Sequence, residues 1–226
     1  MIRIGSGLWK GRRLKLVHSP SVRPMQDKVK GALFNIIQDR LPGALCLDGF
    51  AGTGSVGLEA LSRGAATVVF VDEFYPAIKV LRLNVAACGA EDQSVVLHRE
   101  FNRAVIDLAK KKVAFDIVFL DPPYRLLEER NPLRVLRKRG VVRPGGLIVL
   151  RHYYKVRPET NDFPLDRRVS LGDDILSFFV RAEEGKPAAG AGTPPREALP
   201  VAGKRGKGTS SRGKKRVLPA SGDRRS

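Results

Sequence analysis

An aspartate, two prolines and a tyrosine directly follow an apolar run in the stretch FDIVFLDPPY. The run Ile117–Leu120 is β-branched and aromatic, which is typical of an interior strand, and Asp121, Pro122 and Pro123 end it. Prolines carry no N–H, so the carbonyls around them stay free to accept hydrogen bonds. An acid and a free carbonyl can together hold an exocyclic amine while the ring of Tyr124 stacks on the base. The alternative is a strand that ends in a rigid turn with a solvated acid.

A glycine-rich turn, LCLDGFAGTGSVG, provides a second group of candidate residues. Glycines let the backbone approach a ligand and aim the N–H groups of a helix start at it. Gly52, Gly54 and Gly57 match the dinucleotide-binding pattern. Asp48 argues against NAD, because its carboxylate would face a pyrophosphate of like charge in a partly desolvated crevice. S-adenosylmethionine, a cation without phosphate, fits this turn better.

Three acids beyond the turn are candidates for the rest of such a cofactor. Asp72 ends the apolar run VVFVD and could accept hydrogen bonds from two ribose hydroxyls; the alternative is a helix-capping acid. Glu73 is adjacent, although strand alternation points it to the opposite face. Glu100 follows VVLHR and could meet the adenine amine, with an ordinary surface glutamate as the alternative.

A parallel α/β sheet would bring these residues together, and the chain has the alternation of strands and helices that predicts one. The expected strands are Ala44–Asp48, Thr67–Asp72, Ser94–His98, Asp116–Leu120 and Gly146–Leu150. The expected helices are Ser55–Arg63, Tyr75–Cys88, Asn102–Lys111 and Leu126–Arg139. Ligands of such sheets collect at the carboxyl ends of the strands where the strand order reverses, and Asp48 and Asp121 both leave strands at that edge.

The two ends of the folded region depart from this alternation. Arg143–Gly146 reads as a turn into the next strand. Arg167–Leu171 and Asp174–Val180 read as a closing antiparallel hairpin. Before the first strand, Arg3–Lys15 reads as a small basic hairpin and Gln26–Gln38 as a helix. We therefore expect a mostly parallel sheet with helices on both faces, a C-terminal hairpin and a small N-terminal extension.

The charge of the chain points to a polyanionic partner. Forty-one Lys and Arg stand against 23 Asp and Glu, for a net charge of +18, which favours nucleic acid or an anionic membrane surface over a mere surplus for solubility. No apolar run is long enough to span a bilayer, and the N-terminus lacks the apolar core of a signal peptide. Cys46 and Cys88 lack metal-ligand spacing and read as reduced thiols, which favours the cytoplasm.

Composition divides the chain into three regions. Residues 1–40 form the basic hairpin and helix, in which Trp9 and Gly11 are interleaved with cations that could grip RNA phosphates; a solvated basic face is the alternative. Residues 41–181 form the α/β domain. Residues 182–226 are rich in Gly, Pro, Ser, Ala, Lys and Arg without an apolar period, which predicts a disordered basic tail.

The motifs also carry a family resemblance. D-P-P-Y after an apolar strand, with D-x-F-A-G-x-G in the first loop, resembles the methyltransferases that modify exocyclic nitrogens of bases. Residues 2 to 181 resemble, more narrowly, the bacterial 16S rRNA guanine-N2 methyltransferases of the RsmD type. The matching stretches are RIGSGLWKGRRL, SVRPMQDKVKGALFNII, LDGFAGTGSVGLEALSRGA, the asparagine of VLRLNV, FLDPPY and LGDDILSFF.

The resemblance implies a Rossmann-like, seven-stranded class I methyltransferase fold, S-adenosylmethionine as donor and the guanine conventionally numbered 966 as acceptor. Taken with the residues above, it gives a catalytic set of Asp121, Pro122, Pro123 and Tyr124. The cofactor-binding set is Asp48, Phe50, Ala51, Gly52, Gly54, Asp72, Glu73, Glu100 and Phe101. The substrate-binding set is Arg3, Lys10, Arg12, Arg13, Arg23, Asp27 and Lys28. No metal is expected, and the expected partner is 16S rRNA within a partly assembled small subunit, bound by a monomer.

Four places depart from the usual family pattern. Gly49 replaces the apolar residue that usually follows Asp48, and Glu100-Phe101 replaces an Asp followed by a small residue. Met25-Gln26 stands where small polar residues are common, and Arg151 occupies a strand end that is often acidic. These departures bear on the adenine contact and on substrate placement, whereas the reaction type rests on the motifs that are present.

Three other functions remain open from the sequence. A noncatalytic RNA-binding assembly factor on the same fold would be expected to lose Asp48 or Asp121, and both are present. A DNA or other RNA amino-methyltransferase is the nearest rival, although those that act on adenine often carry Asn in place of Asp121 and lack the N-terminal segment. An NAD-linked oxidoreductase would bind NAD and not S-adenosylmethionine.

Overall fold

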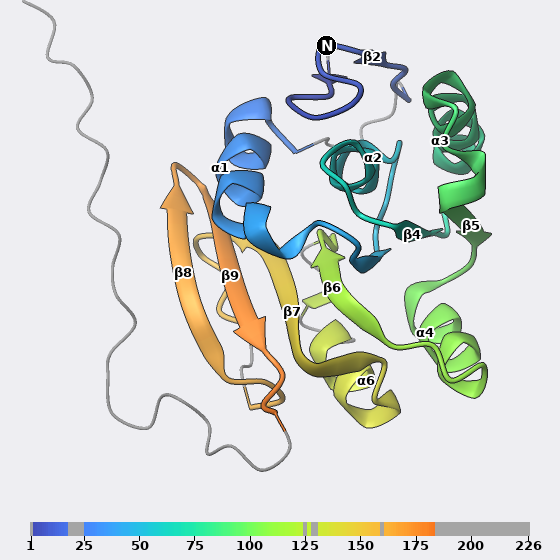
Figure 1. Ribbon diagram of the computed structural model, residues 1–226. Coiled ribbons are helices and arrows are strands. Elements are labelled where there is room, and N and C mark those ends of the chain that lie inside the picture. The colour runs from blue at the N-terminus through green and yellow to red at the C-terminus, as the bar shows by residue number, and fades with distance from the viewer. Residues whose placement is uncertain (1, 18–24, 124–125, 128–130, 159–160, 184–226) are drawn as a thin grey trace, which may run out of the picture.

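The computed structural model describes residues 2–17, 25–123, 126–127, 131–158 and 161–183. Its main sheet has the strand order β5-β4-β3-β6-β7-β9-β8 (Figure 1). The parallel strands are β3 (Leu45–Asp48), β4 (Thr67–Asp72), β5 (Ser94–His98), β6 (Phe115–Leu120) and β7 (Val142–Tyr153). The strands β8 (Leu165–Leu171) and β9 (Asp174–Val180) form an antiparallel hairpin, in which β9 pairs with β7. The predicted fold class, a Rossmann-like sheet with a closing hairpin, is confirmed.

Helices cover both faces of the sheet (Figure 1). One face carries α1 (Asp27–Ile37), α2 (Ser55–Ser62) and α3 (Tyr75–Cys88), and the other carries α4 (Phe101–Lys110) and α6 (Pro132–Arg139). Strand side chains alternate between the faces, so Phe70 packs in the core with the first set of helices while its neighbours Val69 and Val71 pack with the second. Two short 3-10 turns, Gln38–Arg40 and Glu91–Gln93, follow α1 and α3.

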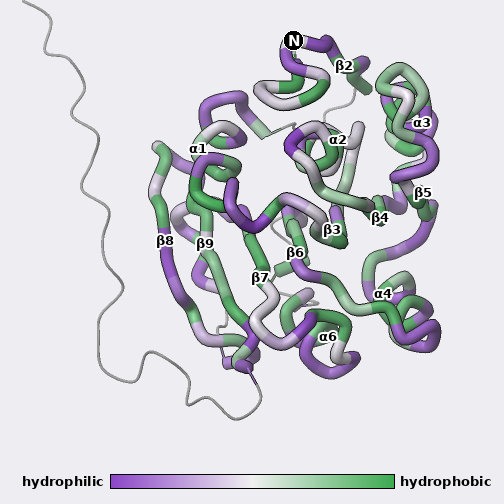
Figure 2. Tube along the Cα trace, in the orientation of Figure 1, coloured by the Kyte–Doolittle hydropathy of each residue, from purple (hydrophilic) through white to green (hydrophobic). Residues whose placement is uncertain are grey.

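The hairpin strands differ sharply in hydropathy. In Figure 2, β9 is hydrophobic and lies inside the sheet, whereas β8 at the edge is largely hydrophilic. The sequence of β8 is LDRRVSL, and its arginines are exposed. Charged residues on an edge strand discourage pairing with another chain. The sheet therefore ends at β8.

The N-terminal segment packs over α2, on the same face as α1 (Figure 1). Its strands β1 (Ile2–Arg3) and β2 (Arg13–Leu14) pair antiparallel, as the predicted basic hairpin requires. The side chains of Ile2, Ile4 and Leu14 are buried in the core that α1 and α2 share with the sheet. The apolar residues of the hairpin therefore anchor it, while its cations remain exposed.

Two predicted boundaries near β7 are wrong. A single helix from Leu126 to Arg139 does not form, because Asn131 has a non-helical backbone and its Oδ1 accepts a hydrogen bond from Leu133 N–H at the start of α6. Pro132 disfavours a helical Asn131, which explains this break. The expected turn Arg143–Gly146 lies within β7, where it forms a bulge opposite Asp116 and Gly145 has φ of 73°.

The chain crosses the sheet between β3 and β6. From β3 it proceeds to β4 and β5 on one side, and it then returns to β6 on the other side of β3. This reversal is the place where ligands of open α/β sheets bind, beyond the carboxyl ends of the strands. The segments that follow β3 and β6 are the two motifs identified in the sequence.

Candidate functional site

A cleft of about 1030 Å³ opens at this reversal point. Helix α1 contributes Leu33 to its wall, and the residues before α1 contribute Met25 and Gln26. Most of the predicted site residues line it: Asp48, Phe50, Ala51, Gly52, Asp72, Glu73, Glu100, Phe101, Asp121, Pro122 and Pro123. Gly54 is not part of the lining, and Tyr124 lies outside the described residues. The cleft therefore combines the two motifs in one site large enough for a cofactor and a base.

The glycine turn has a conformation that only glycine adopts readily. Gly54 has φ of 83° and immediately precedes α2, and a Cβ there would collide with the side chain of Leu81. The turn consequently folds back tightly, so that Ala51 and Gly52 face the cleft. Ser55 and Val56, the first residues of α2, also line the cleft.

Asp48 is buried behind this turn, with an exposed fraction of 4%. Its Oδ2 accepts a hydrogen bond from Gly57 N–H at 2.9 Å. Burial, aided by the carboxylates of Asp121 and Asp72, raises the pKa of Asp48 to about 7, although the Gly57 N–H opposes the rise. A cation in the cleft would stabilise the ionised carboxylate, whereas a phosphate would oppose it. The charge preference inferred from the sequence is therefore matched by the environment of Asp48.

The Asp72 carboxylate accepts hydrogen bonds from two backbone N–H groups and can accept further ones from a ligand. Its Oδ2 accepts from Gly52 N–H at 2.7 Å, and its Oδ1 accepts from Phe74 N–H at 2.8 Å just before α3. A carboxylate has about four acceptor sites, so two such bonds leave room for ribose hydroxyls. Glu73 and Glu100 also line the cleft. Glu100 caps α4, because its Oε2 accepts from Arg103 N–H at 2.9 Å.

Two of the departures from the family pattern compensate each other. A Cβ on Gly49 would lie 2.6 Å from Cε2 of Phe101, far inside a normal contact. The large ring of Phe101 thus occupies the space that a side chain after Asp48 would fill. Phe101 stacks on Phe50 with the ring centroids 4.9 Å apart, and both rings line the cleft. The pair forms an apolar wall that can take the flat face of an adenine.

Asp121 meets an arginine that the motifs did not predict as a partner. Arg151 Nη1 donates to Asp121 Oδ2 at 2.8 Å and to Oδ1 at 3.1 Å. On its other side, Arg151 Nε donates to Asp174 Oδ1 at 3.0 Å, and Nη2 lies 2.8 Å from the same oxygen. The three side chains form one row across the ends of β6, β7 and β9, and all of them line the cleft. We call this row the Asp121–Arg151–Asp174 array.

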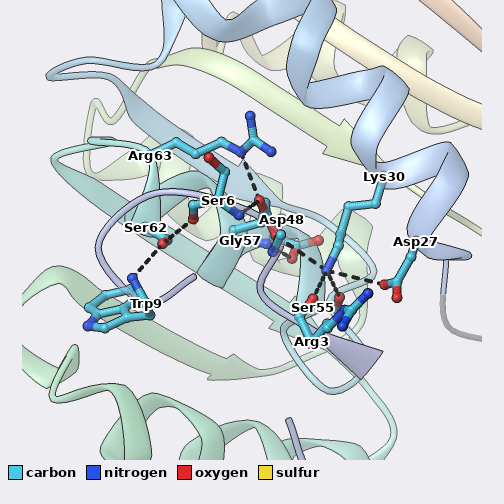
Figure 3. A network of polar contacts seen from close by, with 12 residues as sticks. Arg3, Ser6, Trp9, Asp27, Lys30, Asp48, Ser55, Gly57, Ser62 and Arg63 are labelled. Atoms are coloured by element: carbon cyan, nitrogen blue, oxygen red, sulfur yellow. Dashed lines mark hydrogen bonds and ion pairs between the residues drawn. The ribbon is translucent and has the colours of Figure 1, made fainter. Parts of the chain in front are cut away.

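A second ionic network fastens the N-terminal segment to α2 (Figure 3). Glu59 is buried, and its carboxylate accepts hydrogen bonds from Gly5 N–H at 2.6 Å and Ser6 N–H at 3.0 Å. The ammonium of Lys30 lies 3.4 Å from Glu59 Oε2 and donates to Ser55 Oγ and to the Arg3 carbonyl. Because Ser55 is the first residue of α2 and lines the cleft, this network links the N-terminal segment to the wall of the cleft.

The predicted substrate-binding residues that the structure describes divide into three groups. Arg3, Lys10 and Asp27 line a small cavity of about 320 Å³, together with the Lys30–Glu59 pair. The guanidinium of Arg12 donates to the carbonyl of Ala87 at the end of α3. The residues Arg13 and Lys28 are exposed. Arg23 lies outside the described residues.

Sequence reasoning missed the partners of Arg151 and the Lys30–Glu59 pair. A usable signal existed for the pair, because each residue interrupts an apolar helical period, in DKVKGALF and SVGLEALS. A charge on the buried stripe of a helix requires a partner.

Among the described residues, no group of three or more His, Cys, Asp or Glu could hold a metal ion. In the same part of the chain, no helix is both long and apolar enough to cross a membrane.

The chain is similar to one protein family over most of its length and to individual ribosomal RNA methyltransferases. The family described as Conserved hypothetical protein 95 matches residues 2–180. The Ribosomal RNA small subunit methyltransferase D of Escherichia coli K12 is 42% identical over 149 residues, which cover 65% of this chain and 72% of that protein. The protein of the same name from Haemophilus influenzae is 36% identical over 152 residues, which cover 65% and 76%.

A solved structure of a hypothetical protein from Thermus thermophilus superposes with a TM-score of 0.69 at 30% identity, covering 81% of this chain and 99% of that one. The 16S rRNA N2 G1207 methyltransferase of Thermus thermophilus, solved with S-adenosylmethionine and guanosine, has a TM-score of 0.59 at 20% identity. It covers 72% of this chain and 45% of its own, and it shares the fold.

Proposed function

The chain belongs to the Conserved hypothetical protein 95 family, and on that premise we propose that it is an S-adenosylmethionine-dependent 16S rRNA methyltransferase of the RsmD type. Its acceptor is the exocyclic N2 of a guanine, at the family position 966. The observation that carries the proposal is the single cleft in which Asp48, the glycine turn and Asp121-Pro122-Pro123 come together.

The residues of the cleft fit S-adenosylmethionine chemically. The carboxylate of Asp48 suits the cationic amino acid part, and the backbone around Gly52 lets it approach closely. Asp72 has free acceptor sites for the ribose hydroxyls, and Phe50 and Phe101 present an apolar wall to the adenine. Glu73 and Glu100 complete the proposed cofactor-binding set with Ala51 and Gly54. When bound, the cofactor supplies an activated methyl group on its sulfonium.

The segment after β6 holds the acceptor base. Asp121 and the Pro122 carbonyl each accept a hydrogen bond from the N2 amine of a flipped guanine, while Pro123 fixes the backbone and Tyr124 stacks on the ring. The N2 lone pair is delocalised into the guanine ring, so it is a poor nucleophile. Two hydrogen bonds that pull the amine protons out of the base plane localise that lone pair. The protein thus contributes chiefly by positioning the base.

The basic N-terminal segment holds the RNA backbone. Arg3, Lys10, Arg12, Arg13 and Lys28 lie on or beside the segment that α2 anchors, and cations there neutralise phosphates. We assign the same RNA-binding role to Asp27 and, from the sequence alone, to Arg23. We place the protein in the cytoplasm as a monomer that acts on a partly assembled small subunit. Residues 184–226 lie outside the described residues, and we propose from their composition that the basic region 182–226 also binds RNA.

Nucleoside mass spectrometry of 16S rRNA tests the proposal. RNA from cells with the gene should contain one N2-methylguanine that is missing from RNA of cells without it. The purified protein with S-adenosylmethionine should then restore that methyl group on small subunits from the deletion strain. Identical modification in both strains would reject the proposed substrate, and a protein that binds this RNA without restoring the methyl group would favour the noncatalytic assembly factor.

A further inference from the structure

Arg151 lies beside Asp121, where it can control the protonation state and the orientation of the Asp121 carboxylate. The register of β6 and β7 pairs Leu120 with Leu150, so the next position on each strand brings Asp121 beside Arg151. Both oxygens of Asp121 receive the same Nη1 group, at 2.8 and 3.1 Å. The exposed fraction of the Arg151 side chain is 13%, against 27% for Asp121. The arginine therefore lies behind the carboxylate, and the carboxylate lies nearer the solvent of the cleft.

Asp174 fixes Arg151 in this orientation. Two donors of Arg151, Nε and Nη2, converge on Asp174 Oδ1 at 3.0 and 2.8 Å, which leaves Nη1 aimed at Asp121. The guanidinium is planar and rigid, so fixing one edge fixes the other. Asp174 begins β9, directly opposite Tyr153 at the end of β7. The closing hairpin thus extends to the reaction site through this contact.

We propose that Arg151 is the positioning residue of this methyltransferase: held by Asp174, it keeps Asp121 an ionised, oriented acceptor for the amine of the base. The inference rests on the proposed function and deepens it. Asp121 then accepts hydrogen bonds from N2 during transfer, and the released proton passes to water at the mouth of the cleft. Arg151 itself touches neither the base nor the cofactor.

The electrostatics of the array agree with the geometry. Burial raises the pKa of Asp121, Arg151 opposes that rise by its charge and hydrogen bonds, and the carboxylate of Asp174 adds to it. The other charged groups that line the cleft are Asp48 on β3, Asp72 at the end of β4, Glu73 after it, Arg99 and Glu100 before α4, and Asp173 before β9. Among the described residues, Arg151 is the cation that pairs with Asp121. Its removal leaves the Asp121 carboxylate close to the acids Asp48 and Asp174 without that partner.

The pH dependence of single-turnover methyl transfer tests this role. With S-adenosylmethionine saturating, which holds Asp48 ionised, the acid limb of the rate reports Asp121. Arg151→Gln should lower the plateau rate and move the acid limb to higher pH by about one unit or more. Arg151→Lys, which keeps the charge, should return most of the shift.

Asp174→Asn provides a second and opposite readout. It removes the competing carboxylate while an amide oxygen can still accept from Arg151, so the acid limb should move to lower pH. Opposite shifts from two neighbours of Asp121 require an electrostatic cause, because loss of structure alone would move both variants the same way. This variant also keeps the proposal testable if Arg151→Gln fails to fold.

The control is Arg143→Gln on the same strand. Arg143 Nη1 pairs with Asp116 at 2.6 Å, at the other end of β6 and β7 and outside the cleft, so its acid limb should stay at the wild-type pH. S-adenosylmethionine affinity, measured by calorimetry, should be unchanged within about twofold in every variant. An unshifted acid limb in Arg151→Gln, or shifts of the same sign in Arg151→Gln and Asp174→Asn, would overturn the proposal. A wild-type protein that transfers no methyl to the RNA would instead reject the proposed function.

Discussion

The strands β6 and β7 carry an Asp–Arg pair at each end, and the two pairs have different surroundings. At the amino end Asp116 pairs with Arg143, with exposed fractions of 33% and 51%. At the carboxyl end Asp121 pairs with Arg151, with exposed fractions of 27% and 13%. Asp116 also accepts from Leu45 N–H at 2.8 Å, which ties it to β3, whereas Asp121 faces the cleft.

The surroundings of each ion pair determine whether it only stabilises neighbouring strands or also presents a charged group to a ligand. Solvent screens the amino-end pair, and exposed pairs of this kind contribute about 0–1 kcal/mol to stability. At the carboxyl end the arginine is shared with Asp174, water is partly excluded, and the carboxylate stays accessible to a ligand. The first pair fastens neighbouring strands, and the second presents a charged acceptor at the reversal point of the sheet.

The largest expected effect separates the two aspartates by activity. Asp121→Asn should reduce methyl transfer to 16S rRNA by about 10²- to 10³-fold, because an electrostatic acceptor for the amine is lost. Asp116→Asn should leave the rate within about twofold of wild type. Single-turnover assays of both variants at saturating cofactor measure the difference. Equal rates for wild type and Asp121→Asn would show that the carboxyl-end pair has no chemical role.

A fully buried pair extends the comparison from activity to stability. Glu59→Gln removes the charge that Lys30 and Arg63 share and leaves a buried ammonium without its carboxylate, which should cost about 3 kcal/mol in the free energy of unfolding. Urea denaturation measures this cost.

The exposed pair Arg99–Asp107, with a separation of 3.0 Å, supplies the matched control for that measurement. Asp107→Asn should change the free energy of unfolding by less than about 1 kcal/mol. A Glu59→Gln protein as stable as Asp107→Asn would contradict the assigned anchoring of the N-terminal segment.

The affinity of the cleft for S-adenosylmethionine should depend on pH through the ionisation of Asp48. Its pKa of about 7 in the folded protein lies above the ordinary value of 3.8, so protons must leave before a cation can pair with the carboxylate. The affinity for S-adenosylmethionine should therefore rise about tenfold from pH 6 to pH 8 and level off above it. Titration calorimetry across this range measures the rise. Asp48→Asn should bind weakly with no such dependence, and a pH dependence retained in that variant would assign it to another group.

The same raised pKa has the opposite consequence for the protein without cofactor. The folded state holds the Asp48 proton up to a pH of about 7, whereas the unfolded state releases it near 4, so stability falls as the pH rises between these values. The Asp48 carboxyl, which we expect to bind the cofactor, therefore lowers the stability of the cofactor-free protein as the pH rises toward 7.

The smallest expected effect concerns the amino-end pair itself. Arg143→Gln should lower the free energy of unfolding by less than about 1 kcal/mol, because Asp116 keeps its bond from Leu45 N–H. Thermal unfolding of this variant beside wild type measures the change. A loss of several kcal/mol would show that the bulge of β7 depends on this contact.

Local sequence signals predicted most of the fold. Helix α3 has the predicted bounds because Pro76 stands in its first turn and Gly89 ends it in a left-handed conformation with φ of 61°. The boundaries near β7 were wrong because local signals there were misleading: Pro144 and two glycines suggest a turn. The flanking Val142 and Leu147 pair with β6, and Gly145 and Gly146 exchange backbone hydrogen bonds with Arg181 just after β9, so the stretch stays within the strand as a bulge.

The site was predictable where one stretch of sequence contains the chemistry. The glycine turn and Asp121-Pro122-Pro123 are contiguous motifs, and the strand order brings them to one edge. The link between Arg151 and Asp174 spans a hairpin whose register the sequence does not specify. The fit of Phe101 against Gly49 likewise depends on how α4 packs on the sheet, so it appears only in three dimensions.

A crystal structure of the protein with S-adenosylhomocysteine and guanosine would show whether Asp121 and Pro122 hold the acceptor base. We expect the guanine N2 to lie within hydrogen-bond distance of a carboxylate oxygen of Asp121 and of the Pro122 carbonyl, with Arg151 still bound to Asp121 from behind. A guanine held by other residues of the cleft, with Asp121 and Arg151 paired only to each other, would contradict this expectation.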